Sequence, residues 1–148
     1  MTERVFLDTN ILVYAYDHDA PEAKRLRARE ILTKALRLGD AVVSTQVLSE
    51  FHVTVTRKFA SPLDLASAAE VIRHLSRLQV LGIDAALVLR AIDCQQRHGI
   101  SFWDAQILAA AERAGCRQVL SEDLNHGQGY FDLRVINPFI DRPDPGSG

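Results

Sequence analysis

The sequence is poor in cysteine and in long apolar segments, and each shortage excludes a class of protein. Its 148 residues include only two cysteines, Cys94 and Cys116, which do not form a C-x-x-C pair. We therefore expect reduced thiols in a cytoplasmic protein rather than a disulfide framework. No apolar run approaches the roughly 20 residues of a membrane-spanning helix, and MTERVFLD does not resemble a signal peptide. We expect no membrane segment.

Net charge is also small. A formal charge of −2 makes the chain as a whole a poor binder of polyanions, so a nucleic-acid role requires a local basic patch. A chain of this length buries enough surface to fold without a disulfide or a structural metal. We predict one domain over residues 1–140, followed by a flexible tail, 141–148, that is rich in proline and glycine.

What the sequence does contain is a succession of short apolar runs separated by helical patterns. The runs predict five strands, at 4–7, 41–44, 79–81, 118–121 and 133–136. The helical patterns cover 11–16, 19–38 with Asp19 as N-cap, 46–59, 63–77, 84–98 and 100–115. Strands that are apolar throughout and separated by helices are typical of an α/β fold, in which helices cover both faces of a mostly parallel sheet.

Four acidic residues are predicted to lie near one edge of this sheet, beyond the carboxyl ends of the strands, where such folds bind ligands. Asp8 ends the first strand, and Glu50 lies in the first turns of the helix after the second. Asp104 lies in the first turn of the helix that leads to the fourth strand, and Asp123 follows that strand. Structural roles are also open: Asp8 can cap a helix, and Ser101-Phe-Trp-Asp104 matches a capping box.

Clustered carboxylates require a counter-charge, because like charges a few ångströms apart raise each other's pKa. The flanking sequences FLDTN, LSEFH, FWDAQ and SEDLN contain no lysine or arginine beside the four acids. A divalent cation supplies the missing charge, and all-oxygen ligands favour Mg²⁺ or Mn²⁺. Such sites hold phosphate oxygens and activate water, so the pattern predicts phosphodiester hydrolysis.

The four acids lie in segments that follow one another along the chain: VFLDTNILVYAYD, STQVLSEF, ISFWDAQILAAA and VLSEDLNHGQ, with LRVINPF after them. In this order the segments resemble the PIN-domain ribonucleases and, within them, the VapC-type toxins of bacterial toxin–antitoxin pairs. The resemblance implies a three-layer α/β/α sandwich around a mostly parallel five-stranded sheet. It also implies a Mg²⁺- or Mn²⁺-dependent endoribonuclease.

By position, the resemblance makes the four acids both the catalytic residues and the metal ligands. Asn10 and Ser121 become polar supports that orient the carboxylates or a metal-bound water. Glu122 stands beside Asp123 as a rival for the fourth acidic position, and we prefer Asp123. The toxin subgroup further implies a homodimer and a small antitoxin whose C-terminal segment packs over the active-site groove.

An acidic pocket repels RNA, so cations near it must guide the RNA backbone. The first candidates lie on the second predicted helix: Lys24, Arg25, Arg27 and Arg29. Arg57 and Lys58 are the second candidates. A solvated helix face explains the first group equally well. Trp103 invites base stacking, although a buried aromatic beside the helix start is the safer expectation.

Other function classes fit the sequence less well. The aspartyl-phosphate phosphatases need a second aspartate two residues after the first, where this chain has Asn10. A nucleotide-binding Rossmann domain needs a G-x-G-x-x-G motif after the first strand, and none is present. The alternative that stays open is a catalytically silent PIN-like module that binds RNA or an antitoxin.

Overall fold

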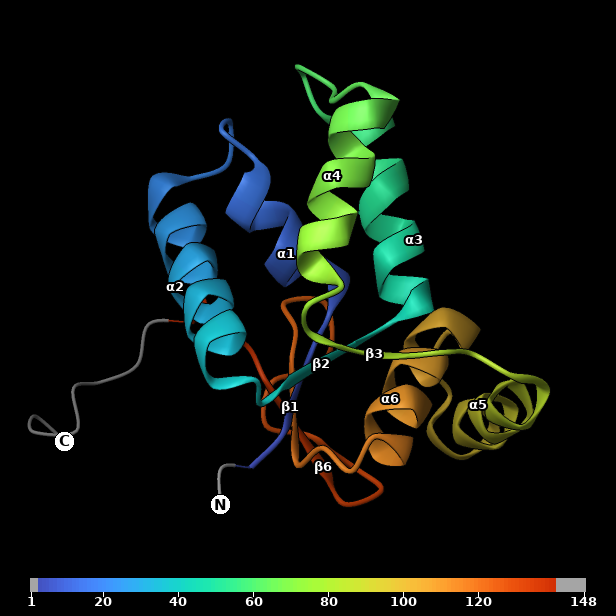
Figure 1. Ribbon diagram of the computed structural model, residues 1–148. Helices are drawn as coiled ribbons and strands as arrows, with labels where there is room; N and C mark the ends of the chain where they lie inside the picture. Colours follow the sequence, from blue (N-terminus) through green and yellow to red (C-terminus); the bar gives the residue numbers. More distant parts are fainter. Residues whose placement is uncertain (1–2, 141–148) are drawn as a thin grey trace, which may run out of the picture.

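A computed structural model describes residues 3–140 (Figure 1). The predicted tail, 141–148, lies outside the described residues. The strands are β1 (Val5–Leu7), β2 (Ala41–Ser44), β3 (Gln79–Leu81), β4 (Gln118–Leu120), β5 (Gly129–Tyr130) and β6 (Leu133–Ile136). The α-helices are α1 (Thr9–Tyr16), α2 (Glu22–Leu38), α3 (Thr45–Val53), α4 (Leu65–Leu75), α5 (Ala85–His98) and α6 (Phe102–Arg113).

The strands form one sheet in the order β3-β2-β1-β4-β6-β5. Every pairing is parallel except that of β5 with β6. The sheet has six strands rather than the predicted five, because β5 is a two-residue strand with no recognisable alternation. From β1 the chain moves outward to β2 and β3, then returns to build β4 on the other side of β1. This reversal leaves a crevice beyond the ends of β1 and β4.

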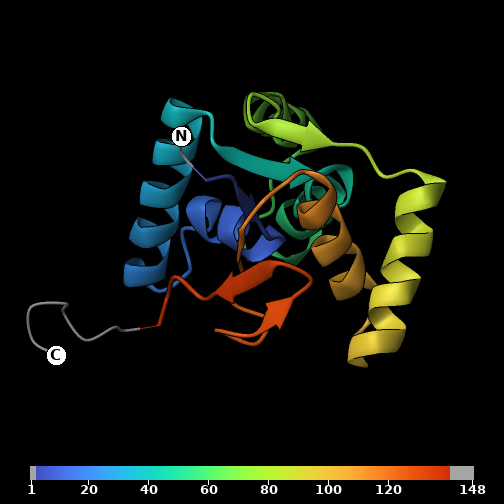
Figure 2. The ribbon, with the colours of Figure 1, turned by 90° about the horizontal axis from the view of Figure 1, so that it is seen from below.

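Helices cover both faces of the sheet, as expected from strands that are largely apolar throughout. Figure 2 shows α2 on one side and the α5–α6 pair on the other. Phe6, Val119 and Val135 are fully buried in three adjacent parallel strands, and Leu108 of α6 is fully buried as well. Within residues 3–140, no helix is both long enough and apolar enough to cross a membrane.

Two helix boundaries differ from the sequence expectations. Asp19 does not cap α2: the helix begins at Glu22, after Pro21, with no side-chain cap. The α2 helix ends at Gly39, whose φ of 70° lies in the left-handed region that favours glycine. The predicted helix over 46–59 is α3 followed by a π-helical turn, Thr54–Lys58.

Strand β2 passes directly into α3, without a loop. Ser44 is the last residue of the strand and also the N-cap of the helix, where its Oγ accepts from the amide of Val47 at 3.3 Å. Ser44 is fully buried, so the start of α3 is fixed against the core. The second turn of α3, which carries Glu50, therefore has a defined position beside the end of β1.

Candidate acidic site

Asp8 lies where β1 ends and α1 begins, and it serves both elements. Its Oδ1 accepts from the amide of Thr9 at 2.7 Å, so the helix-capping role foreseen for it is present. Its Oδ2 accepts from the Ser121 hydroxyl at 2.7 Å. Only 6% of Asp8 is exposed. Burial raises the pKa of this carboxyl to about 6, and the charges of Asp123 and Glu50 add to the rise, although the two hydrogen bonds oppose it.

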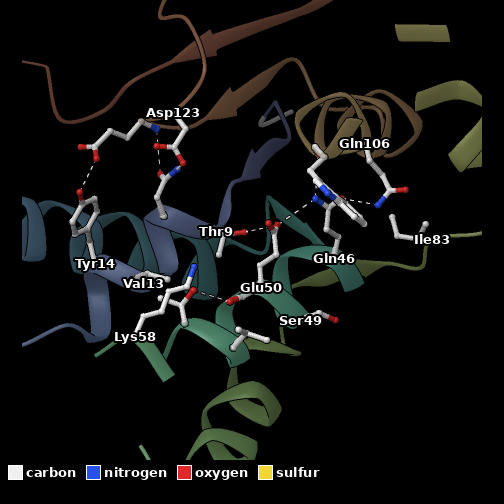
Figure 3. Close-up of a pocket in the computed structure, with 15 residues that line it drawn as sticks. Thr9, Val13, Tyr14, Gln46, Ser49, Glu50, Lys58, Ile83, Gln106 and Asp123 are labelled. Atoms are coloured by element: carbon white, nitrogen blue, oxygen red, sulfur yellow. Dashed lines mark hydrogen bonds between the residues drawn. The ribbon is translucent and has the colours of Figure 1, made fainter. Parts of the chain in front are cut away.

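Glu50 faces the end of β1 from α3. Its Oε1 accepts from the Thr9 hydroxyl at 3.1 Å and from Gln46 Nε2 at 3.2 Å. Figure 3 shows the side chains of Thr9 and Gln46 directed at Glu50. Gln46 also receives a hydrogen bond from Gln106 of α6 at 2.8 Å. Thr9, Gln46 and Gln106 were not predicted from the sequence, although the four-residue spacing of Gln46 and Glu50 on one helix was a usable signal.

Asp104 lies in the first turn of α6, as predicted, and Ser101 is the N-cap. The Ser101 hydroxyl accepts from the Asp104 amide at 3.1 Å, so the cap and the acid occupy the same turn. Burial raises the pKa of Asp104, and the charge of Asp123 raises it further. Asp123 therefore lies within electrostatic range of both Asp104 and Asp8.

Asp123 is positioned by the two residues predicted to be polar supports. Asn10 Nδ2 donates to Asp123 Oδ2 at 3.0 Å, and the Ser121 hydroxyl accepts from the Asp123 amide at 3.2 Å. Because the same hydroxyl donates to Asp8, Ser121 joins the ends of β1 and β4. These side chains hold the middle of the loop after β4, and backbone hydrogen bonds to β6 hold its two ends.

Glu122 has a different environment from its neighbour Asp123. Lys24 Nζ lies 2.6 Å from Glu122 Oε2, and the Tyr14 hydroxyl donates to Oε1 at 2.6 Å. Burial acts to raise the pKa of Glu122, but hydrogen bonds from Lys24 and Tyr14 hold it below its ordinary value. The charge of Glu122 is therefore already compensated.

The other four acids lack such compensation. Within residues 3–140, no lysine, arginine or histidine forms an ion pair with Asp8, Glu50, Asp104 or Asp123. In that same range, no group of three or more acidic, histidine or cysteine side chains is arranged so that it could hold a metal ion. The all-oxygen chemistry and the excess of negative charge nevertheless suit a hard divalent cation.

A cavity of about 790 Å³ opens beside these residues (Figure 3). Glu50 and Asp123 line it, whereas Asp8 and Asp104 do not. Lys58, from the π-helical turn, lines the same cavity. Trp103 also lines it and is 61% exposed, so the expectation of a buried aromatic was wrong.

The basic residues of α2 do not line this cavity, although Lys24 contacts two residues that do, Tyr14 and Glu122. The lining of this cavity contains none of the four cations predicted on that helix. Lys24 pairs with Glu122, and Arg29 donates to the carbonyl of Ala15 at 3.0 Å. Arg27 lines a second cavity, on the α2 face of the sheet. Of the predicted cations, Lys58 is the one that the structure places at the acidic cavity.

Comparison with known proteins identifies a family. The profile of the PIN domain matches residues 5–130, most of the chain. Ribonuclease VapC23 of Mycobacterium tuberculosis is 33% identical over 124 residues, which cover 80% of this chain and 92% of that protein.

Solved structures with the same fold come from several bacteria. VapC20 of M. tuberculosis, described as a toxin that cleaves the sarcin–ricin loop, superposes with a TM-score of 0.67 at 23% identity, covering 88% of this chain and 98% of that one. A toxin–antitoxin complex from Klebsiella pneumoniae gives a TM-score of 0.64 at 18% identity, covering 90% and 97%. These similarities confirm the predicted α/β class and the resemblance to VapC-type toxins.

Proposed function

Because the chain belongs to the PIN-domain family, we propose that it is a Mg²⁺- or Mn²⁺-dependent endoribonuclease and the toxin of a toxin–antitoxin pair. One observation carries the proposal: four acids that have no cationic side-chain partner within residues 3–140 lie where the sheet reverses its strand order, beside an open cavity. The ribonuclease relative supports RNA as the substrate. A fold-level match alone would not, because one fold carries many functions.

Asp8, Glu50 and Asp104 are proposed to hold the cation, and Asp123 to assist it. When bound, the ion would lower the pKa of a water molecule and neutralise charge on the scissile phosphate. Thr9 and Gln46 keep Glu50 turned toward the end of β1. Ser121 fixes Asp8 through Oδ2, and its contact with the Asp123 amide fixes the loop after β4. These contacts fix the carboxylates individually, and binding of the ion would then require them to move closer together, because no three of them form a ligand set within residues 3–140.

We propose Lys58 as the residue that draws the RNA backbone toward the acids. It lies at the end of the π-helical turn and lines the cavity, which gives its ammonium group access to a phosphate there. π-helical turns are frequent at functional sites. Lys24 already pairs with Glu122, so a second proposal keeps the three other cations of α2 that were predicted from the sequence: Arg25, Arg27 and Arg29.

A second copy of this chain and a small antitoxin are the proposed protein partners. Structural relatives with known complexes support the antitoxin, since they include toxin–antitoxin assemblies. The cavity also has apolar lining residues that a peptide segment could cover: Val13, Val53, Ile83 and Trp103. Copurification with the product of a neighbouring small gene and light scattering of the purified chain test the two partners separately.

The nuclease proposal is tested with purified protein, free of antitoxin, and a panel of structured RNAs. We expect cleavage with Mg²⁺ or Mn²⁺, none with EDTA, and none by Asp8→Asn. Glu30→Gln is the matched control, because Glu30 is an exposed acid on α2 that lines the second cavity. Cleavage that survives EDTA or Asp8→Asn would overturn the metal-site assignment. RNA binding without cleavage under every condition would instead favour the silent module.

A further inference from the structure

Glu122 and Asp123 are consecutive acids that both line the acidic cavity but have different hydrogen-bond partners. Asp123 receives its hydrogen bond from Asn10, within the acidic site. Glu122 is held by Lys24 of α2 and Tyr14 of α1, each at 2.6 Å. Side-chain exposure is 36% for Lys24 and 23% for Glu122, so the pair is partly buried. We call Tyr14, Lys24 and Glu122 the anchor.

The anchor is braced by aromatic contacts as well as by charge. Lys24 Nζ lies 5.2 Å from the centroid of the Tyr14 ring and 5.9 Å from that of Phe139. The Tyr14 and Phe139 rings meet edge to face at 5.1 Å. Cation–π contacts of this length are attractive and restrict the ammonium group to one place. The anchor therefore ties α1, α2 and the loop after β4 into one unit.

The tie reaches Asp123 through a single side chain. Asn10 Oδ1 accepts from the amide of Glu122 at 3.1 Å, while Asn10 Nδ2 donates to Asp123 Oδ2 at 3.0 Å. The position of the Glu122 backbone and that of the Asp123 carboxylate are thus set together. If Glu122 loses its partners, its carboxylate is free to turn toward the other acids. The Glu122 amide is then no longer held in place, so the hydrogen bond that it donates to Asn10 no longer fixes the Asn10 side chain.

We propose that the anchor is a positioning device: Lys24 and Tyr14 hold Glu122 so that Asp123 presents its carboxylate to the acidic site. The inference rests on the proposed function, and it assigns Lys24 to the partly buried ion pair with Glu122 rather than to RNA. Glu122 is then a support for Asp123 and not a fourth ligand.

The test compares Lys24→Met with Lys34→Met, a matched change at an exposed lysine of the same helix that lines the second cavity. We measure kcat, KM for RNA, the salt dependence of KM and the Mg²⁺ concentration for half-maximal cleavage. Lys24→Met should lower kcat and raise the Mg²⁺ midpoint about tenfold, the size expected for losing a group that orients a metal ligand. KM and its salt dependence should stay unchanged.

The opposite pattern overturns the proposal. If Lys24 binds RNA phosphate, Lys24→Met raises KM and reduces the slope of log affinity against log salt by about one, with an unchanged Mg²⁺ midpoint. Lys24→Glu alone should raise the Mg²⁺ concentration for half-maximal cleavage. The double variant Lys24→Glu with Glu122→Lys should reverse most of that increase. If the double variant needs as much Mg²⁺ for half-maximal cleavage as Lys24→Glu alone, the anchor is also contradicted. Tyr14→Phe keeps the ring and removes the donor, and should give an intermediate shift.

Amide hydrogen exchange keeps this test apart from that of the nuclease proposal. Residues 121–125 should exchange faster in Lys24→Met and Tyr14→Phe than in wild type or Lys34→Met, whether or not RNA is cut. Unchanged exchange there overturns the anchor even in an active nuclease. Faster exchange in a protein that cuts no RNA would leave the anchor in place and reject the nuclease. Mn²⁺ binding by calorimetry, weaker in Lys24→Met, is the corresponding readout without turnover.

Discussion

Asp8 shows at the scale of one residue that function and stability make opposite demands. It is buried, its oxygens are hydrogen-bonded, and the nearby charges of Asp123 and Glu50 disfavour its ionised form. At neutral pH the ionised carboxylate therefore destabilises the fold until a cation neutralises it. A purely structural cap would not need such an environment, because an exposed aspartate caps a helix equally well, as Asp64 does for α4.

This environment predicts a pH dependence with a definite sign. Between 3.8 and about 6, the ordinary and folded pKa values of Asp8, the folded protein holds a proton that the unfolded chain has released. The free energy of unfolding should therefore fall as pH rises through this window, by about 3 kcal/mol in total for this group. Urea denaturation in EDTA measures it as the difference between wild type and Asp8→Asn.

The free energy of unfolding of wild type minus that of Asp8→Asn should be larger near pH 4 than at pH 7. Glu30→Gln again serves as the control and should follow the wild-type profile. If the difference between wild type and Asp8→Asn instead increases as pH rises through the window, the Asp8 carboxyl does not have a raised pKa, and the proposal that it needs a cation is contradicted.

At the scale of one element, α6 combines a helix cap and a proposed metal ligand in a single turn. Ser101 caps the helix through its hydroxyl, and Asp104 lies three residues later with a raised pKa. The two functions reside in different side chains, so they are separable by mutation. The Ser101 half of the predicted capping box is therefore present in the turn that carries Asp104.

Two substitutions should separate these functions. Ser101→Ala should lower the free energy of unfolding by about 1 kcal/mol, the usual contribution of an N-cap, and leave cleavage nearly intact. Asp104→Asn should preserve the fold and reduce cleavage more than about a hundredfold, since even partners behind a metal ligand contribute ten- to a hundredfold. Urea denaturation and initial rates distinguish them. If Asp104→Asn chiefly unfolds the protein, its role is the cap.

The π-helical turn provides the second element-scale prediction. Lys58 lines the acidic cavity, whereas Arg57 beside it does not. Lys58→Gln should raise KM for RNA and reduce the salt slope of binding by about one, because one phosphate contact is lost. Arg57→Gln is the matched control within the same turn and should change neither quantity. Equal effects of the two variants would indicate a diffuse basic surface.

At the scale of the whole molecule, the acidic site depends on the order of the strands. β1 and β4 are neighbours in the sheet although more than a hundred residues separate them, and α3 and α6 bring Glu50 and Asp104 to the same edge. A ligand held by all four acids would therefore join segments from the whole length of the chain. Its binding energy would stabilise the native state as a unit.

Mg²⁺ or Mn²⁺ should accordingly raise the thermal stability of the wild type. At about 100 times its dissociation constant, an ion that binds only the native state adds about 2.7 kcal/mol. Thermal denaturation at a series of Mg²⁺ concentrations measures the effect, with Ca²⁺-free EDTA buffer as the baseline. Asp8→Asn should lose most of the increase, and Glu30→Gln should keep it. An equal increase in all three proteins would point to ion binding elsewhere.

Local sequence patterns determined the fold class and five of the six strands, because apolar runs, caps and helix periods are properties of neighbouring residues. They also indicated that Asp8, Glu50, Asp104 and Asp123 lie at strand ends and helix starts, where a parallel sheet gathers its loops. β5 escaped prediction because two residues carry too little pattern. Asp19 was predicted to be the N-cap of α2, but the helix begins at Glu22, with Pro21 at the N-cap position and no side-chain cap.

Tertiary structure alone decided the contacts between distant residues. Lys24 and Glu122 are 98 positions apart, so no local pattern could show that their charges pair and that Asp123 has no cationic partner within residues 3–140. The exposure of Trp103 could not be predicted from the sequence either, because helix periodicity does not show which residues are covered by neighbouring helices and loops. Sequence spacing fixes which residues share a face; only packing determines which charges find a partner.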